Sequence, residues 1–439
     1  MENTTFKDTI TAISTPAGEG GIAVIRISGK DALNFSASIL SYRGILKDRM
    51  IKIAVLNTGT VQDEVLLLYF KSPHSFTGED VLEIQCHGNY FLAKRIAEAL
   101  IKNGCRAAEP GEFTRRAFLN GRIDLTKAEG ILDLICAKSE SALVAAYAQV
   151  KGEVFSAIDA LQKQIITLVA NASAAIDYPE EYLSEVTNLE LFAAVKPIKK
   201  ELIALKDSFD SGVLIREGVR VVIVGLPNVG KSLLMNRLLG HDRAIVTDEA
   251  GTTRDTVEES FLYRGVRFIL TDTAGIREAA SEAEKQGIER SVRAAEEANL
   301  ILAVAEADKE FILPLPNSKP VLFVKNKTDL FSVKKGTEDN AVNISALTQH
   351  NIETLKEEIY ARTVGKISAS GVSINNLRQF TAVLKTLEAL DRIVQSSQIS
   401  LDCVLSDLNE AYRALGTVTG ITATDSIINA IFSNFCVGK

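Results

Sequence analysis

The segment from Gly225 to Ser232 reads GLPNVGKS and lies between two apolar runs, Val221 to Val224 and Leu233 to Met235. A buried strand, a glycine-containing turn and a helix form the setting of a phosphate-binding loop, where backbone N–H groups and the helix dipole meet anionic oxygens. Lys231 can reach the β- and γ-phosphates, and the Ser232 hydroxyl can ligate Mg²⁺. An ordinary surface turn would leave the Lys-Ser pair and the buried strand unexplained. The pattern therefore predicts a binding site for a nucleoside triphosphate.

A second motif follows the apolar run 269–271, where the chain reads DTAG from Asp272 to Gly275. The Asp272 carboxylate can hold the magnesium shell, and the Gly275 N–H can donate to the γ-phosphate. Such a segment senses hydrolysis because its contacts depend on that phosphate. Upstream, the sequence GTTRD offers the Thr253 hydroxyl as a further magnesium ligand, the alternative being a polar connecting loop.

The base is indicated by a third motif, NKTD, which follows the apolar run 321–324 and ends at Asp329. A carboxylate at that position can accept hydrogen bonds from the N1–H and the exocyclic amine of guanine, a pair of donors that adenine lacks. The segment from Ser345 to Leu347 follows a predicted strand at 341–344 and should close over the base. These motifs, in this order and each after a strand, predict that the nucleotide is GTP.

Composition is typical of a soluble, cytoplasmic enzyme. The 439 residues can form two to four domains, and no apolar window is long enough to cross a membrane. The net charge of −7 argues against a broadly basic RNA surface, so RNA contacts must be local or shared with a partner. The cysteines are odd in number and form no CxxC pair, which predicts neither disulfides nor zinc; most are expected to be small core residues. They are Cys86, Cys105, Cys136, Cys403 and Cys436.

The pattern along the chain predicts a multidomain α/β and α+β fold. Short β-rich runs at 11–13, 22–27 and 65–70 indicate an N-terminal α+β domain at 1–120. Helical periodicity is present in 139–209 and returns in 377–393 and 401–415. Each helical part has an apolar stripe that it cannot bury alone, so the two should pair. We therefore predict a helical domain at 121–216 and 367–439, with a P-loop GTPase domain inserted at 217–366.

Two chemical roles stay open at the level of individual residues. No Gln follows DTAG where Ras-like GTPases carry the residue that orients water. Glu278, Glu282, Glu284 or Glu289 could serve instead, or could be solvated surface. Cys436 is either a nucleophile on a mobile tail, with Lys439 nearby to favour the thiolate, or a buried, inert thiol.

The motifs together resemble one family. The segments SFTGEDVLEIQCHG (75–88), PGEFTRRAFLNGRIDL (110–125), AIVTDEAGTTRD (244–255), DTAGIRE (272–278) and the terminal FCVGK look like those of the tRNA wobble-uridine modification GTPases called MnmE or TrmE. The resemblance runs from Asp8 to Lys439. The GTPase motifs are widespread, whereas the N-terminal blocks and the terminal Cys-x-Gly-Lys are specific to this family.

The resemblance implies a potassium-activated GTPase that works by dimerisation of its GTPase domains. K⁺ would be held by Asn228, Thr247, Glu249 and Thr252, and Mg²⁺ by Ser232 and Thr253; Asn228 could instead be an ordinary turn residue. Glu284 matches the catalytic glutamate. With the motifs above, the predicted nucleotide contacts are Asn228, Val229, Gly230, Lys231, Ser232, Thr247, Glu249, Thr252, Thr253, Asp272, Thr273, Ala274, Gly275, Asn326, Lys327, Asp329, Ser345, Ala346 and Leu347.

The resemblance also implies a folate-binding N-terminal domain at a homodimer interface. Arg26, Glu83, Arg122 and Lys439 match the folate positions, and Arg122 stands where some relatives have Lys. Surface ion pairs in a plain dimerisation domain are the alternative. Cys436 matches a cysteine required for modification. The implied reaction uses 5-formyl- or methylene-tetrahydrofolate and an FAD-containing partner, MnmG, to place an aminomethyl-type group on the wobble uridine of tRNA.

Two other classes of function compete with this one. A ribosome-assembly or regulatory GTPase would bind RNA without modifying it, but such a protein is expected to carry a KH-like domain, and no GxxG-centred loop in a βαα pattern follows the GTPase motifs. A helical scaffold with a vestigial GTPase conflicts with the intact Lys231, Ser232 and Asp329.

Overall fold

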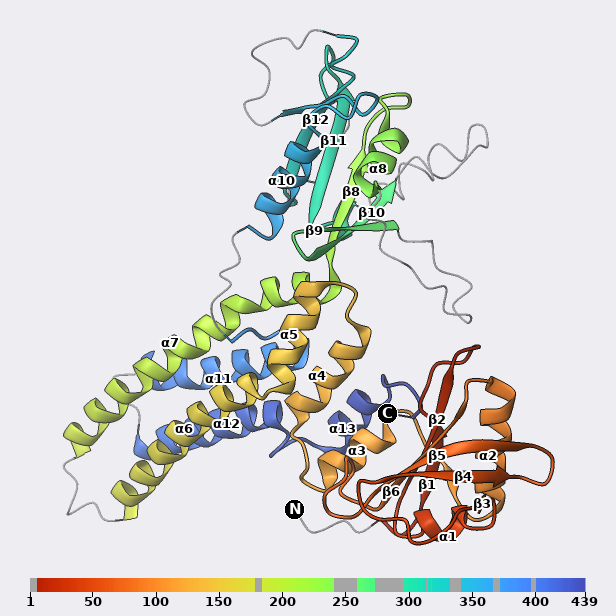
Figure 1. The fold of residues 1–439 in the computed structure, drawn as a ribbon. Coiled ribbons are helices and arrows are strands. Elements are labelled where there is room, and N and C mark those ends of the chain that lie inside the picture. The colour runs from red at the N-terminus through yellow and green to blue at the C-terminus, as the bar shows by residue number, and fades with distance from the viewer. Residues whose placement is uncertain are drawn as a thin grey trace, which may run out of the picture. The chain divides into compact units, whose positions relative to one another are not determined.

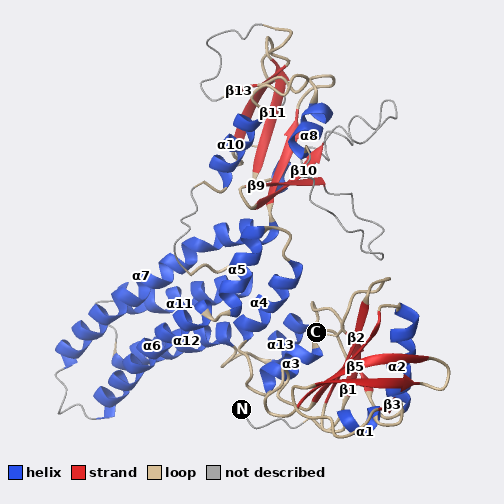
Figure 2. Cartoon of the chain, in the orientation of Figure 1, coloured by secondary structure: helices blue, strands red, loops and turns tan. Residues whose placement is uncertain are grey.

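The computed structural model describes residues 6–177, 184–240, 259–272, 295–312, 315–316, 318–331, 341–365, 372–395 and 400–438, with the backbone alone for 184–190 and Asp272. The chain divides into two compact units. The first comprises Met1–Leu132, Gln149–Thr167 and Asn409–Lys439, and the second comprises Asp133–Ala148 and Leu168–Leu408. Figure 1 follows the chain through its elements, and Figure 2 separates its helices from its strands.

The N-terminal domain is built on a seven-stranded sheet in the order β3-β4-β5-β6-β2-β1-β7. Helix α2 (Tyr90–Lys102) packs its apolar stripe, including Ile96 and Leu100, against one face of the sheet. The alternating burial along β2 follows from this, since only every second side chain faces the helix. The elements before α2 are β1 (Ile10–Ile13), β2 (Ile22–Ser28), α1 (Ala32–Ser36), β3 (Leu40–Ser41), β4 (Ile51–Asn57), β5 (Gln62–Phe70) and β6 (Val81–His87), and β7 (Arg106–Ala107) follows it. The three predicted strands are confirmed as β1, β2 and β5.

Helix α3 (Glu112–Leu119) carries a fully buried guanidinium, that of Arg116. Its nitrogens lie 2.8 Å from Asp8 Oδ1, 2.9 Å from Glu112 Oε1 and 3.2 Å from Glu79 Oε1. Burial alone would raise the pKa of Glu112, but hydrogen bonds from Arg106, from the Glu109 N–H and from Arg116 lower it. Because the folded-state pKa is lowered, this carboxylate stabilises the fold at neutral pH, and the stabilisation is lost as the pH falls through that lowered value.

The helical part comprises α4 (Leu125–Cys136), α5 (Glu140–Val150), α6 (Glu153–Asp177), α7 (Ser184–Glu217), α11 (Leu377–Gln395), α12 (Leu401–Thr419) and α13 (Asp425–Phe432). Helix α7 precedes the GTPase segment and α11 follows it, and the two pack together with Phe209 stacked on Phe380 at 4.2 Å between ring centroids. Asp133 joins the same two parts of the chain, because it accepts from Arg216 at 2.8 Å and from Asn375 at 3.2 Å. The predicted insertion of the GTPase domain into a helical domain is confirmed. The residue boundaries of the four predicted segments stay predictions.

The GTPase domain has a six-stranded sheet in the order β13-β12-β11-β8-β10-β9, parallel except for the β9–β10 pair. Its elements are β8 (Val219–Val224), α8 (Lys231–Leu239), β9 (Glu259–Tyr263), β10 (Val266–Asp272), β11 (Leu300–Glu306), β12 (Val321–Asn326), β13 (Val342–Asn343) and α10 (Ile352–Thr363). The carboxyl ends of parallel strands meet at one edge of a sheet, so the loops after β8, β12 and β13 come together there. Strand β11 was not among the predicted strands, although its sequence from Leu300 to Ala305 is an unbroken apolar run.

The expectation that most cysteines lie in the core is wrong. Cys86 and Cys105 are buried, whereas Cys136, Cys403 and Cys436 are exposed. The exposed ones sit at the end of α4, in the first turn of α12 and on the C-terminal tail. Among the helices that the structure describes, none is long and apolar enough to span a membrane.

Replacing Arg116 by Met preserves most of the side-chain volume but leaves the mostly buried Glu79 without a cation, while Glu112 keeps its pair with Arg106. We expect the unfolding free energy to fall by about 3–5 kcal/mol, the cost of leaving a buried carboxylate unpaired. Urea unfolding followed by circular dichroism measures it, since the chain has no Trp. Arg95→Met is the control because its pair with Glu98 is exposed; an equal loss in both variants would contradict the prediction.

Candidate functional site

The phosphate-binding loop is held by two close backbone approaches that only glycine allows. A Cβ on Gly225 would lie 2.4 Å from the carbonyl oxygen of Val304 on β11. Gly230 has φ +94° at the start of α8, and a Cβ there would lie 2.5 Å from Asn326 Nδ2. The glycines of the motif therefore permit contact with β11 and β12, and not only the approach of phosphate.

Asn326, the last residue of β12, connects the loops at this edge of the sheet. Its Nδ2 donates to the Val229 carbonyl at 2.8 Å, and its Oδ1 accepts from the Ala346 N–H at 3.0 Å. The side chain is 2% exposed, so both hydrogen bonds are shielded from water. One amide thus fixes the phosphate-binding loop relative to the segment expected to cover the base.

Asp329 is oriented by Ser345, whose hydroxyl donates to Asp329 Oδ1 at 2.6 Å and accepts from the Thr348 N–H at 3.1 Å. Among the described residues, Asp329 has no other hydrogen-bond partner, so Oδ2 is available to a ligand. Arg237 of α8 supports the same segment, since its Nε donates to the Ala346 carbonyl at 3.0 Å. Arg237 was not among the predicted site residues, because no motif in the sequence marks it. Leu347 is 62% exposed beside this segment.

Lys231 and Ser232 begin α8 as the sequence predicts. The Lys231 Nζ donates to the carbonyls of Gly225 at 2.8 Å and Leu226 at 3.0 Å, and the side chain is buried against the loop. Asn228 sits at the turn with φ +67°, a left-handed conformation that Asn tolerates better than most residues.

Several predicted residues lie outside the described residues, namely Thr247, Glu249, Thr252, Thr253, Thr273, Ala274, Gly275, Glu284 and Lys439. Asp272 ends β10, next to β8 in the sheet, but its side chain is not described. Within the described ranges, no group of three or more His, Cys, Asp and Glu could hold a metal ion. A magnesium site of this class does not require such a group, because phosphate oxygens and water fill most of its shell.

A second cluster lies in the N-terminal domain, where Arg26 on β2 faces Glu83 on β6 directly across the sheet. The guanidinium contacts Glu83 Oε1 through Nε at 2.9 Å and Nη2 at 2.7 Å. The Arg26 Cζ lies 6.0 Å from the ring centroid of Phe76 and 5.7 Å from that of Phe113. Glu83 Oε2 has no partner among the described residues, and the side chain is only 17% exposed. A carboxylate oxygen without a protein donor, on a side chain that is mostly buried, can accept from a ligand N–H.

The C-terminal tail is anchored beside this pair. The Gly438 carbonyl accepts from Ser14 Oγ at 3.0 Å and from Arg26 Nη1 at 3.4 Å. Val437 forms an antiparallel bridge with Pro110, and the Gly111 N–H donates to the Cys436 carbonyl at 3.3 Å. The sequence suggests a mobile tail, but these contacts fix its backbone and leave Cys436 exposed.

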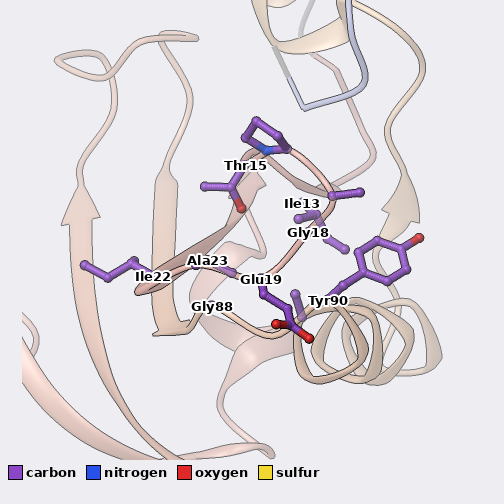
Figure 3. A pocket seen from close by; sticks show the side chains of 12 residues that line it. Ile13, Thr15, Gly18, Glu19, Ile22, Ala23, Gly88 and Tyr90 are labelled. Carbon is purple, nitrogen blue, oxygen red and sulfur yellow. The ribbon is translucent and has the colours of Figure 1, made fainter. Parts of the chain in front are cut away.

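Arg122 contacts the loop that carries Phe76, because its Nε donates to the Ser75 carbonyl at 3.2 Å. A pocket of about 260 Å³ lies between the segment 13–23, Gly88 and the start of α2. Figure 3 shows the side chains of Glu19 and Tyr90, both of which line this pocket. Arg26, Glu83 and Arg122 do not line it, so the pocket is separate from the predicted folate residues.

The phosphate-binding loop, the bonded Asn326 and the Asp329–Ser345 pair at one edge of a parallel sheet define a P-loop GTPase. Comparison with known proteins narrows this class. Residues 9–122 match the family model described as "GTP-binding protein TrmE N-terminus", and residues 125–436 match "MnmE helical domain". The chain belongs to the MnmE family of GTPases, as its motifs suggested.

Relatives align along their whole length. The "tRNA modification GTPase MnmE" of Natranaerobius thermophilus is 40% identical over 456 residues, covering 99% of this chain and 100% of the relative. That of Carboxydothermus hydrogenoformans is 41% identical over 461 residues, with the same coverage. That of Clostridioides difficile is 40% identical over 455 residues, covering 98% of this chain and 99% of the relative.

Asp329→Asn tests base recognition. The amide presents a donor where guanine needs an acceptor, so we expect GTP binding to weaken by about tenfold or more and xanthosine nucleotides, which carry an oxygen there, to bind instead. Titration with GTP and XTP measures both affinities. Unaltered GTP affinity would remove Asp329 from the base-binding role.

Proposed function

We propose that the protein is the GTP-hydrolysing subunit of a cytoplasmic tRNA-modifying complex. With the FAD-containing partner MnmG, it installs an aminomethyl-type group at the 5-position of the wobble uridine. The names and full-length alignment of the relatives support the tRNA substrate. The observation that carries the proposal is the anchoring of the tail, with its exposed Cys436, beside Arg26 and Glu83.

In the GTPase domain, Lys231 and the N–H groups of the loop bind the phosphates, and the Ser232 hydroxyl contributes to Mg²⁺ binding. The Thr253 hydroxyl and the Asp272 carboxylate would contribute to the same shell, and the Gly275 N–H would donate to the γ-phosphate. Asp329 and Lys327 select guanine, supported by Ser345. Asn228 and the segment 247–252 would hold a monovalent cation, whose charge would offset that developing between the β- and γ-phosphates. Glu284 would orient the attacking water through a bridging water.

The Arg26–Glu83 pair fits a folate. Glu83 Oε2 can accept from the amine and ring N–H of a pterin, Phe76 is 38% exposed and offers a flat apolar contact, and the Arg26 and Arg122 guanidiniums can meet carboxylates. When bound, 5-formyl- or methylene-tetrahydrofolate supplies the one-carbon unit. Glu83 then holds the pterin end, while Ser14 and Gly111 fix the backbone that carries Cys436.

A homodimer is supported by the face of the N-terminal sheet that α2 does not cover. Ile51, Ile53 and Val55 on β4 are 65%, 61% and 51% exposed, and Leu66, the cross-strand neighbour of Ile53, is 37% exposed. Contiguous exposed apolar residues on a sheet face are typical of an interface. This face continues across β5 to Glu83 on β6, so a second copy packed there would adjoin the proposed folate site.

GTP hydrolysis takes no part in the organic chemistry of this reaction, so its use is conformational. Dimerised GTPase domains separate after hydrolysis, and the separation rearranges the site shared with the partner.

Potassium dependence tests the proposed cation site. Because Asn228 has φ +67°, Ala at this position would be strained, and Asn228→Gly removes the side chain without strain. We expect wild-type hydrolysis to be at least about tenfold faster in K⁺ than in Na⁺, and the variant to lose that preference while it still binds GTP. Equal wild-type rates in the two salts at matched ionic strength would contradict the cation site.

Cys436→Ser tests the role of the tail. The substitution keeps the backbone contacts of the tail, so GTP binding and potassium-stimulated hydrolysis should stay near wild type. Modification in a reconstitution with MnmG, folate and tRNA should be abolished, because a hydroxyl is a far weaker nucleophile than a thiolate near neutral pH. Cys403→Ser, another exposed cysteine, is the control and should retain modification. Full modification by Cys436→Ser would exclude an essential thiol.

A further inference from the structure

Glu306, the last residue of β11, bridges two lysines next to the base-recognition motif. Its Oε1 lies 2.5 Å from the Nζ of Lys327, and its Oε2 accepts from the Nζ of Lys309. The Glu306 side chain is only 12% exposed, so solvent screens its ion pairs less than it would screen exposed ones. Hydrogen bonds from Lys309 and then from Lys327 lower the pKa of Glu306 below its ordinary value.

Lys327 is the second residue of NKTD and follows Asn326, whose amide is bonded to the phosphate-binding loop. Its backbone has φ +66°, and its side chain is 29% exposed. Strand β11 is also tied to Asn326 by the Ala307 N–H, which donates to the Asn326 carbonyl at 2.8 Å. The position of Glu306 relative to Lys327 is therefore fixed by the backbone as well as by the ion pair.

We propose that Glu306 is a positioning residue for guanine-nucleotide binding, acting through Lys327. The inference rests on the nucleotide-binding role proposed for Lys327. A lysine side chain has several rotatable bonds, and ordering it on binding costs affinity. Glu306 holds the Lys327 ammonium in one position before the nucleotide binds. The Lys327 side chain is therefore already ordered in the free protein, and less conformational entropy is lost on binding. Lys309 fixes the second carboxylate oxygen but does not act on Lys327 directly.

The test is a double-mutant cycle on the full chain, read by titration with GDP and by thermal unfolding. Glu306→Gln keeps the shape but removes the charge, and we expect it to weaken GDP binding about five- to tenfold, the usual cost of ordering one long side chain. In a Lys327→Met background, the same Glu306→Gln change should alter GDP affinity by less than about twofold, since Lys327 is no longer there to be positioned. Lys309→Met is the matched control, because it leaves the Glu306–Lys327 pair intact, and it should retain wild-type affinity to within about twofold.

Three outcomes would overturn the proposal. A Glu306→Gln loss of equal size in both backgrounds would show that Glu306 does not act through Lys327. Unchanged GDP affinity in Lys327→Met would mean that Lys327 has no role in nucleotide binding. If Asp329→Asn still weakens GTP binding as predicted, base recognition by Asp329 would remain supported. Unchanged affinity in Glu306→Gln alone would show that no positioning is needed. If Glu306→Gln lowers the melting temperature, Glu306→Asp, which keeps the charge, carries the same cycle and should show a smaller loss.

Discussion

The GTPase half of the structure depends on the buried amide of Asn326. One side chain donates to the phosphate-binding loop at Val229 and accepts from the segment that supports Asp329, at Ala346. Both partners are backbone groups, so the amide fixes the path of the chain and not only the position of other side chains. Gly230 is required at this point, because a Cβ there would collide with the same amide. Phosphate binding and base recognition are therefore linked mechanically through one residue.

The N-terminal half has a comparable centre in Arg26. Its guanidinium pairs with Glu83 across the sheet and also donates to the carbonyl of Gly438, from the opposite end of the chain. Buried Arg116 pairs with Glu79, which lies in the same loop as Phe76, whose ring the Arg26 guanidinium contacts. Glu83 and the tail that carries Cys436 thus contact the same cation, which supports the proposal that a folate site and an anchored thiol share one domain.

The sequence predicts the GTPase fold well because each motif follows a strand end, where buried apolar runs and glycine leave little freedom. It also predicts the insertion, because the periodicity of 154–168 and of 377–393 requires a partner for each apolar stripe. It does not reveal β11 as a part of the site, since an apolar run without a motif does not show that Glu306 at its end will meet Lys327. Arg237 and Ser14 are missed for a similar reason: their contacts are with backbone carbonyls distant in sequence, and a carbonyl leaves no mark on residue type. The exposure of Cys136, Cys403 and Cys436 is missed because thiol burial depends on packing that no local pattern encodes.

The central claim is that the chain takes part in modifying the wobble uridine of tRNA, with GTP hydrolysis serving that reaction. Mass spectrometry of wobble nucleosides in tRNA from cells lacking the protein tests it most directly, with cells complemented by the wild-type chain as the reference. The claim predicts that the aminomethyl-type derivatives of the wobble uridine disappear in the deletion and return on complementation. Unchanged uridine modification in the deletion would contradict it and would favour a GTPase that binds RNA in ribosome assembly without modifying it.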